Sequence, residues 1–283
     1  MSGLPLDLIV VPFDVERRDT SAARAPGELL ARGFPDRLRG AGFDVRQTLV
    51  EPFPLGQAKS LRVTLIGCAI AKDVALARSQ GRFPLILSGG CLAAVGVVAG
   101  LQQAGIDPAV LWIDAHGDFN NPESSPSGYW DGMALAAVCG VSLPDLRGLV
   151  PGFHPLAVDR VLHVAGRAFD PLETGNVRRH GLALVPPDEL AGEQARERLR
   201  HLTGAGNFYL HVDLDGLDPR DAPAVSFPEP DGARLDDVLA TLGALPPPAA
   251  MTFSALSFER ADAEEAERTV ATCLRLVETF ARV

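Results

Sequence analysis

The pattern of apolar and polar positions divides the chain into short apolar runs that alternate with longer segments of helical spacing. Short apolar runs bounded by polar or glycine-rich stretches are typical of buried strands. The predicted strands are Leu6–Pro12, Phe43–Val50, Leu85–Ser88, Val110–Asp114, Val161–Ala165, Leu182–Val185, Phe208–Asp213 and Met251–Phe258. Because strands alternate with helices, the pattern indicates a parallel sheet with helices on both faces.

Helices are predicted where apolar residues recur at helical spacing without proline. The predicted helices are Gln57–Gln80, Cys91–Ala104, Asp131–Gly140 and Asp262–Arg282. In the last of these, Asp262 can cap the start and Glu264 lies in the first turn. Both positions suit the positive end of a helix dipole, which strengthens the prediction of a closing helix.

Proline- and glycine-rich segments interrupt this alternation at three places. Two of them, Asn120–Gly128 and Asp218–Gly232, follow strands that end in aspartate. Long loops after the carboxyl ends of parallel strands are where such folds place their binding sites. Leu245–Pro248 reads more simply as a rigid connector.

The composition is that of a globular protein with an acidic surface. The chain has 283 residues, 47% of them hydrophobic, so it can bury a sizeable core. Its formal net charge of −10 argues against a nucleic-acid partner, because phosphate binding requires a basic surface. The start, MSGLPLDLIVVPF, lacks a basic segment, and no apolar run reaches the roughly 18 residues of a membrane helix. Neither a signal peptide nor a membrane association is therefore expected.

The cysteines indicate the compartment. Cys68, Cys91, Cys139 and Cys273 are widely separated and form no C-x-x-C pair. This spacing predicts buried free thiols rather than a disulfide framework or a thiolate zinc site. Free thiols favour a reducing, cytoplasmic setting.

The first candidate cluster for chemistry is WIDAHGDFN, residues 112–120. Asp114 ends a predicted strand, and His116 and Asp118 follow at steps of two. An extended backbone points residues at such steps to one side, so the two carboxylates and the imidazole can converge. A mixture of Asp and His suits hard to borderline cations such as Mn²⁺.

The second cluster is HVDLDGLDP, residues 211–219. Asp213 and Asp215 share one face at the end of another predicted strand, and Asp218 can brace the turn before Pro219. The histidines of the apolar runs, His163 and His211, read as core residues with satisfied hydrogen bonds.

Each cluster alone has a structural explanation, because aspartate commonly caps loops and turns. Both clusters together, each at the end of an apolar strand, are harder to explain in this way. Aspartates gathered without a cation would repel one another and lose solvation, and a bound metal removes both penalties. The sequence therefore predicts a metal site.

The motifs D-A-H-x-D and D-x-D-G-x-D-P, in this order, resemble those of the ureohydrolase family, which includes arginases, agmatinases and formiminoglutamases. The resemblance runs from about Pro84 to the C-terminus and more loosely before it. It implies a three-layer αβα sandwich with a central, mainly parallel sheet, and a single arginase-like domain over residues 1–283. It also implies a two-manganese site and assembly into trimers or hexamers.

The resemblance assigns roles to both clusters. Asp114 and Asp213 resemble the carboxylates that bridge both metals, His116 and Asp215 resemble ligands of one metal, and Asp118 resembles a ligand of the other. The metals would present hydroxide to a guanidinium carbon and release urea and an amine. The free oxygen of Asp118 would hydrogen-bond that hydroxide.

Further matches concern the substrate. Asn120 and Ser127 resemble the arginase loop that binds the amino-acid end of arginine, and Asp170 and Glu173 resemble the acidic pair that receives its α-amino group. Glu259 resembles the carboxylate that orients the guanidinium, which favours paired contacts with an acid. The structural alternative is loop capping for Asn120, Ser127 and Asp170, and a surface salt bridge for Glu259.

The sequence also departs from the family pattern. Leu92 stands where the resemblance places a metal-binding histidine, and the thiolate of the neighbouring Cys91 suits manganese poorly, so a weakened first metal site is expected. Asp131 replaces a histidine that shuttles protons; it could relay a proton or hold a cationic substrate. Phe227 replaces a small threonine and would narrow the pocket.

The leading hypothesis is a metal-dependent hydrolase of the arginase type that acts on a guanidino or related small cationic substrate. The departures keep open a catalytically silent or single-metal family member with a structural or regulatory role. A third possibility, a phosphate or nucleotide binder, rests on Ser88-Gly89-Gly90 before a predicted helix. That segment has no following lysine and no full phosphate-binding motif.

Overall fold

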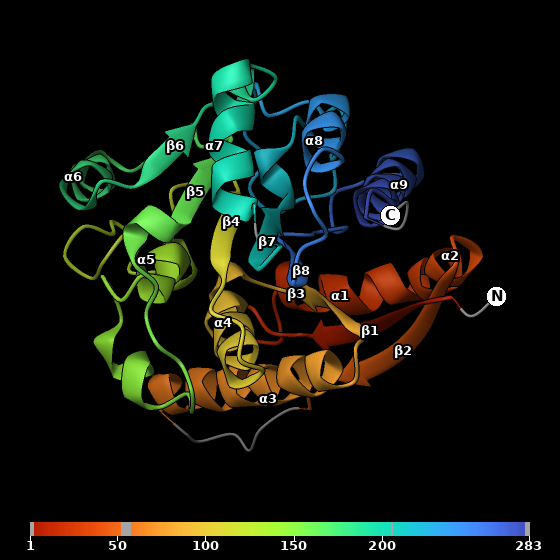
Figure 1. The fold of residues 1–283 in the computed structure, drawn as a ribbon, viewed down its shortest axis with the longest axis horizontal. Coiled ribbons are helices and arrows are strands. Elements are labelled where there is room, and N and C mark those ends of the chain that lie inside the picture. The colour runs from red at the N-terminus through yellow and green to blue at the C-terminus, as the bar shows by residue number, and fades with distance from the viewer. Residues whose placement is uncertain (1–2, 52–57, 205, 281–283) are drawn as a thin grey trace.

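A computed structural model describes residues 3–51, 58–204 and 206–280 of the chain (Figure 1). Within these ranges, strands form one 8-stranded sheet in the order β2-β1-β3-β8-β7-β4-β5-β6. Each neighbouring pair is parallel. The predicted parallel sheet is therefore confirmed.

The strands follow the apolar runs closely. They are β1 (Leu4–Val11), β2 (Phe43–Leu49), β3 (Phe83–Ser88), β4 (Ala109–Ile113), β5 (Val161–Val164), β6 (Ala183–Val185), β7 (Phe208–Asp213) and β8 (Ala250–Ser254). The last strand ends earlier than predicted, because Ala255 adopts a left-handed backbone conformation with φ 55° and turns the chain out of the sheet.

Helices connect the strands. They are α1 (Ser21–Ala31), α2 (Phe34–Gly40), α3 (Lys59–Ser79), α4 (Ala94–Gln103), α5 (Ala134–Val138), α6 (Pro171–His180), α7 (Glu193–Thr203), α8 (Leu235–Leu242) and α9 (Ala263–Glu278). The predicted α3 and α9 are confirmed, although Gln57 and Arg282 lie outside the described residues. The predicted helices from Cys91 and from Asp131 each begin with a short 3-10 turn.

The core has two halves, one on each face of the sheet. On β1, Leu6 and Leu8 pack in a cluster with residues of α1, α2, α7, α8 and α9. Ile9 points to the opposite face and packs in a second cluster with residues of α3, α4 and α5. These two clusters make the three-layer αβα arrangement that Figure 1 shows.

Two helices of the second cluster approach unusually closely. A Cβ added at Gly96 of α4 would lie 2.7 Å from the carbonyl oxygen of Gly67 on α3, and one added at Gly100 would lie 2.6 Å from that of Ala71. Small residues therefore allow α4 to lie against α3. This contact fixes the start of α4, which follows the turn after β3.

The strand order places the predicted clusters together. β4 and β7 are neighbours, so the residues after Ile113 and around Asp213 leave the sheet at the same edge. β3 and β8 continue this edge on the other side of β7. Among the described helices, none is both long and apolar enough to cross a membrane.

Candidate metal centre

Asp114 is oriented by its own chain segment. Its Oδ2 accepts a hydrogen bond from the Trp112 indole at 2.9 Å, and its Oδ1 accepts one from the His116 backbone N–H at 2.7 Å. The residue is buried, so these bonds replace hydration. The W-I-D-A-H sequence therefore both ends β4 and holds the Asp114 carboxylate in place.

Asp213 and Asp215 are held in a similar way at the end of β7. Asp213 Oδ1 accepts the backbone N–H of Asp215 at 3.1 Å and so caps the turn. Asp215 Oδ1 accepts the Ala115 N–H at 3.1 Å, which ties the two loops together. Gly216 permits this contact, since a Cβ there would lie 2.7 Å from the Asp114 nitrogen.

These contacts bring the two sequence clusters together. His116 Nδ1 lies 3.2 Å from Asp215 Oδ2 and 3.7 Å from Asp114 Oδ1. One ligand atom each from Asp114, His116 and Asp215 lies within 4.8 Å of the others. The geometry is therefore that of a group able to share one cation.

Asp118 adds a carboxylate with an unused oxygen. Its backbone is left-handed at φ 49°, and its side chain is buried. Asp118 Oδ2 finds no hydrogen-bond partner among the described residues. A buried carboxylate oxygen without a partner is costly, and a cation would supply the missing interaction.

The turn after β3 contributes Cys91, not Leu92, to this group. Cys91 Sγ lies 2.9 Å from Asp213 Oδ2, and one ligand atom each of Cys91, Asp114 and Asp213 lies within 4.8 Å of the others. Leu92 packs in the apolar cluster on that face of the sheet. The residue that faces the carboxylates is thus one position earlier than the position at which the family resemblance places a metal-binding histidine. The turn after β3 directs Cys91, and not Leu92, toward the carboxylates.

Asp131 fixes that turn. Its Oδ2 accepts the N–H of Cys91 at 2.9 Å, and its Oδ1 accepts the N–H of Leu92 at 2.8 Å. Burial raises the pKa of Asp131 to about 7, although the two backbone hydrogen bonds oppose the shift. These bonds also occupy the N–H groups of Cys91 and Leu92 that an anion would need, so the phosphate-binding hypothesis finds no support here.

The buried acids of this group repel one another, so a positive charge among them would be stabilising. Burial and the neighbouring carboxylates raise the pKa of Asp118, Asp213 and Asp215 above its ordinary value. Burial lowers the pKa of His116, but Asp114 and Asp215 outweigh it and raise the pKa to about 12. Together with the unpartnered oxygen of Asp118, this donor set fits divalent cations.

The group opens into a cavity of about 460 Å³. This size is within the usual range for small-molecule sites. The acidic residues that line the cavity are Asp118, Asp131, Asp170, Glu173, Asp213, Asp215 and Glu229. Arg167 and His116 also line it, but acids predominate, so the cavity favours cationic ligands.

Several predicted substrate residues line this cavity. Asn120 donates to Asp170 Oδ2 at 2.9 Å, so the two side chains are paired with each other. Glu173 accepts the N–H groups of Phe119 at 2.8 Å and Asp170 at 3.0 Å. Glu173 therefore joins the loop after β4 to the start of α6.

Two predicted substrate residues lie elsewhere. Glu259 has a side chain that is 61% exposed and forms an ion pair with Arg24 at 3.8 Å. Ser127 is exposed, and its Oγ accepts the Tyr129 N–H at 3.2 Å. Neither lines the cavity. Glu259 follows the left-handed backbone at Ala255, where the chain turns out of the sheet.

Two further residues that line the cavity, Glu229 and Arg167, were not predicted from the sequence. Glu229 lies 3.8 Å from His116 Nε2, and Arg167 donates to the carbonyls of Glu229 and Pro230 at 2.8 and 2.7 Å. Phe227, which was expected to narrow the pocket, does line the cavity beside His116, with ring centroids 6.2 Å apart. Glu229 could have been found from its place in the long loop after β7, whereas Arg167 carries no motif.

The predictions of core histidines and of buried free cysteines hold in part within the described residues. His211 is buried, with Nδ1 2.9 Å from the Tyr209 hydroxyl and Nε2 3.1 Å from Ser254 Oγ. His163 is buried as well, and its Nε2 lies 2.7 Å from the His116 carbonyl, but its Nδ1 has no hydrogen-bond partner among the described residues. The cysteines are free, three of them buried and Cys68 half-buried.

Comparison with known proteins gives a consistent assignment. The sequence model of the arginase family matches residues 6–278. An arginase from Bacillus caldovelox is 30% identical over 244 residues, which are 79% of this chain and 80% of that protein. An N(omega)-hydroxy-L-arginine amidinohydrolase from Streptomyces lavendulae is 32% identical over 60% of this chain and 59% of its own. The crystal structure of arginase from Bacillus cereus superposes with a TM-score of 0.84 at 26% identity, covering 98% of each chain.

Proposed function

Because this chain belongs to the arginase family, we propose that it is a manganese-type hydrolase that cleaves a carbon–nitrogen bond of a guanidino compound and releases urea. The family assignment supports a metal-dependent hydrolase of the ureohydrolase type. The narrower reaction and substrate are our proposal, and they rest on the chemistry of the cavity.

One observation carries the proposal. The carboxylates after β4 and β7, with His116, converge beside an acidic cavity, and Asp118 keeps a buried oxygen free. Structural needs alone do not explain so many buried acids at one place. Cation binding followed by attack on a cationic substrate explains both the ligands and the acidic lining.

The position of each residue suggests its role in binding cations, in activating water or in holding the turn after β3. Bound cations would supply a water molecule of lowered pKa that is nucleophilic at neutral pH. Asp114, His116, Asp213 and Asp215 would hold the cations together with Asp118 Oδ2, and the other oxygen of Asp118 would accept a hydrogen bond from the attacking water. Asp131 would keep the turn after β3 in register through its two backbone contacts.

The substrate end of the cavity suits a guanidinium attached to an amino acid. Glu229 and Asp170 would attract the cationic groups, and the Asn120–Asp170 pair would contact the amino-acid end. Relatives are named for arginine and for N(omega)-hydroxy-L-arginine. Because Phe227 stands beside His116 at the cavity wall, we propose a substrate no bulkier than these two.

The experiment is a urea-release assay. Purified protein loaded with Mn²⁺ is incubated with arginine, N(omega)-hydroxy-L-arginine, agmatine and guanidino acids. We expect turnover of at least one of them, and loss of that turnover in Asp114→Ala, which removes a carboxylate central to both ligand groups. If the protein releases no more urea than Asp114→Ala on any of these compounds, the proposal is wrong.

A second candidate is a family member that binds one cation and has a structural or regulatory role. The group of Asp114, His116 and Asp215 favours it, since these residues can share an ion without Cys91. Elemental analysis discriminates the candidates. Two tightly bound ions per chain support the hydrolase, while a single ion without turnover supports the second candidate.

The proposed domain organisation and assembly rest on the family assignment. We propose that residues 1–283 form a single domain that associates into trimers or hexamers, as is usual in the family, and that it works in the cytoplasm. Sedimentation analysis of the purified chain tests the assembly, because a monomer at micromolar concentration would contradict it.

A further inference from the structure

We propose that Cys91 is a metal ligand, so that the cation position formed by Cys91, Asp114 and Asp213 (the thiol site) takes Zn²⁺ in preference to Mn²⁺. This inference rests on the proposed function only in assuming that the cavity holds cations. It changes the expected chemistry of one position, because a sulfur ligand replaces the imidazole that the family resemblance implies.

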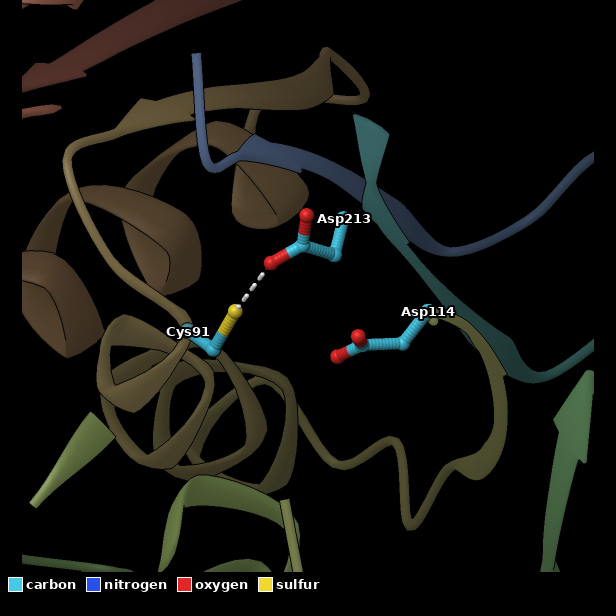
Figure 2. A group of neighbouring side chains, drawn as sticks. All are labelled: Cys91, Asp114 and Asp213. Carbon is cyan, nitrogen blue, oxygen red and sulfur yellow. Dashed lines mark hydrogen bonds between the residues drawn. The ribbon is translucent and has the colours of Figure 1, made fainter. Parts of the chain in front are cut away.

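The geometry of the thiol site suits a sulfur ligand. Figure 2 shows the Cys91 sulfur and the carboxylates of Asp213 and Asp114 pointing into one space from three separate elements. Their ligand atoms lie within 4.8 Å of one another. Tetrahedral zinc with ordinary Zn–S and Zn–O bonds needs about 3.6 Å between a sulfur and an oxygen ligand. The three side chains therefore need only small adjustments to share one ion.

Asp118 provides an independent sign of a ligand at this place. It lines the same cavity as Cys91 and Asp213, and its Oδ2 is buried without a hydrogen-bond partner among the described residues. A cation in this part of the cavity would give this oxygen a partner. The thiol site itself offers one sulfur and two carboxylates, and Asp118 or a water molecule would complete a tetrahedral shell.

The sulfur is held by a chain of buried hydrogen-bonding groups. Ser254 Oγ lies 3.2 Å from Cys91 Sγ and 3.1 Å from His211 Nε2. The Tyr209 hydroxyl lies 2.9 Å from His211 Nδ1, and the His211 ring stacks on Trp112 at 3.6 Å. Such partners orient a ligand and tune its affinity for metal. Cys91 packs in the apolar cluster, but its sulfur also has the polar partners that a metal ligand would have.

The backbone around Cys91 supports the same conclusion. Asp131 accepts the N–H groups of both Cys91 and Leu92, and Leu92 is buried in the apolar cluster. A slip of the turn by one residue would break both hydrogen bonds and expose Leu92 to the carboxylates. The sulfur is thus fixed toward the cation position.

The metal preference follows from the donor set. Thiolate is a soft ligand that favours zinc, whereas carboxylate and water suit manganese. Coordination breaks the S–H bond of Cys91 and releases its proton to solvent. The group of Asp114, His116 and Asp215 lacks sulfur, so the two cation positions would differ in preference.

Cobalt spectroscopy tests the sulfur ligand directly. Co²⁺ is titrated into metal-free protein, and the near-ultraviolet charge-transfer absorption of a cobalt–sulfur bond is recorded. We expect this absorption in the natural protein and in Cys68→Ser, and its loss in Cys91→Ser. Cys68 is a suitable control because it is a free thiol on α3, away from the carboxylates, and its sulfur lies 3.7 Å from the Leu149 carbonyl oxygen.

Metal competition tests the preference. Metal-free protein is dialysed against equal concentrations of Zn²⁺ and Mn²⁺, and the bound metals are counted. We expect at least one zinc ion per chain in the natural protein, bound at the thiol site, and a shift from zinc toward manganese in Cys91→His. Ser254→Ala should bind Co²⁺ about 10- to 100-fold more weakly while it keeps the charge-transfer absorption.

The outcomes separate this inference from the proposed function. Cobalt that binds the natural protein without charge-transfer absorption overturns the sulfur ligand and leaves the proposed hydrolase intact. Absence of bound cobalt in the natural protein overturns both. Manganese in excess over zinc in the natural protein overturns the preference. None of these readings depends on a variant that folds poorly, because each is made on the natural chain.

Discussion

Glu173 shows how a single buried carboxylate can carry both structure and pH dependence. Its two oxygens accept N–H groups from Phe119 and Asp170, so it connects the loop that contains Asp118 to the start of α6. Burial raises its pKa to about 7 even though both hydrogen bonds favour the ionised form. The folded protein therefore holds a proton on Glu173 in a pH range where the unfolded chain has lost it.

The expected consequence is a loss of stability as the pH rises. Between the ordinary pKa near 4.5 and the raised value of about 7, the native state binds more protons than the unfolded state, so the free energy of unfolding falls. In the natural protein we expect the free energy of unfolding to fall by an amount on the order of 2 kcal/mol between pH 5 and pH 8 because of Glu173. Glu173→Gln should lack this fall. Urea unfolding of metal-free protein at both pH values measures it.

The control is Glu197→Gln, which neutralises an exposed glutamate on α7. This variant should show the same difference between the two pH values as the natural protein. If Glu173→Gln and Glu197→Gln behave alike, Glu173 does not titrate in that range.

For single residues, the sequence predicts well which side chains of one extended segment point to the same place. It predicts less well which residues of other segments meet them there. Asp114 and His116 could be paired in advance because alternate residues of an extended segment share a side. Cys91 and Leu92 could not be distinguished, because a turn of one residue more or less exchanges them. Glu259 follows the strand by several residues, and the left-handed backbone at Ala255 redirects that segment.

Among the elements, α3 and α4 depend on glycine for their contact. A Cβ at Gly100 would lie 2.6 Å from the Ala71 carbonyl oxygen and 2.7 Å from Val74 Cβ, both of them in the packed core. Gly175 on α6 is the opposite case, since a Cβ there meets nothing within 4 Å. The two glycines therefore allow a matched comparison.

We expect the same substitution to have opposite effects at these positions. Gly100→Ala should destabilise the protein by about 1–3 kcal/mol, because the helices must move apart. Gly175→Ala should stabilise it by about 0.5–1 kcal/mol, because alanine loses less backbone entropy in a helix. Chemical denaturation of both variants checks this, and a stabilising Gly100→Ala would show that the α3–α4 contact is not tight.

The helices were harder to predict than the strands. Apolar runs identified the strands because a parallel sheet is buried on both faces. The helices α1, α2, α6, α7 and α8 were not predicted. Pro26 lies inside α1, and α7 buries only a narrow stripe, so neither presents the broad apolar face that marked α3. Tertiary packing decides such short helices more than sequence does.

For the whole molecule, cation binding and folding should be linked. A group of buried acids in a chain of net charge −10 stabilises the folded state only when a cation is present. At a cation concentration about 100-fold above the dissociation constant, binding should add about 2.7 kcal/mol to the free energy of unfolding. Thermal unfolding with added metal and with chelator measures the effect.

The comparison for this experiment is between two carboxylates. Asp114→Ala should unfold at the same temperature with metal and with chelator, because it removes a shared ligand. Asp237→Ala, on the exposed face of α8, should keep the full response of the natural chain. An equal response in both variants would show that the cation binds elsewhere.

The fold class could be predicted at this scale, but the strand order could not. Alternation along the chain indicates a parallel sheet without fixing which strands are neighbours. The placement of β8 between β3 and β7 depends on contacts between residues far apart in sequence. The resemblance in the two motifs supplied what alternation could not, since it implied that the two clusters meet.

This placement of β8 affects how the chain can fold as it is synthesised. Until Ala250–Ser254 has left the ribosome, the strands β2-β1-β3 and the strands β7-β4-β5-β6 have no sheet hydrogen bonds to one another. Cys91 belongs to the first set, and Asp114 and Asp213 belong to the second. A nascent chain arrested before residue 250 should therefore hold two separate half-sheets, and the thiol site should form only after β8 has emerged.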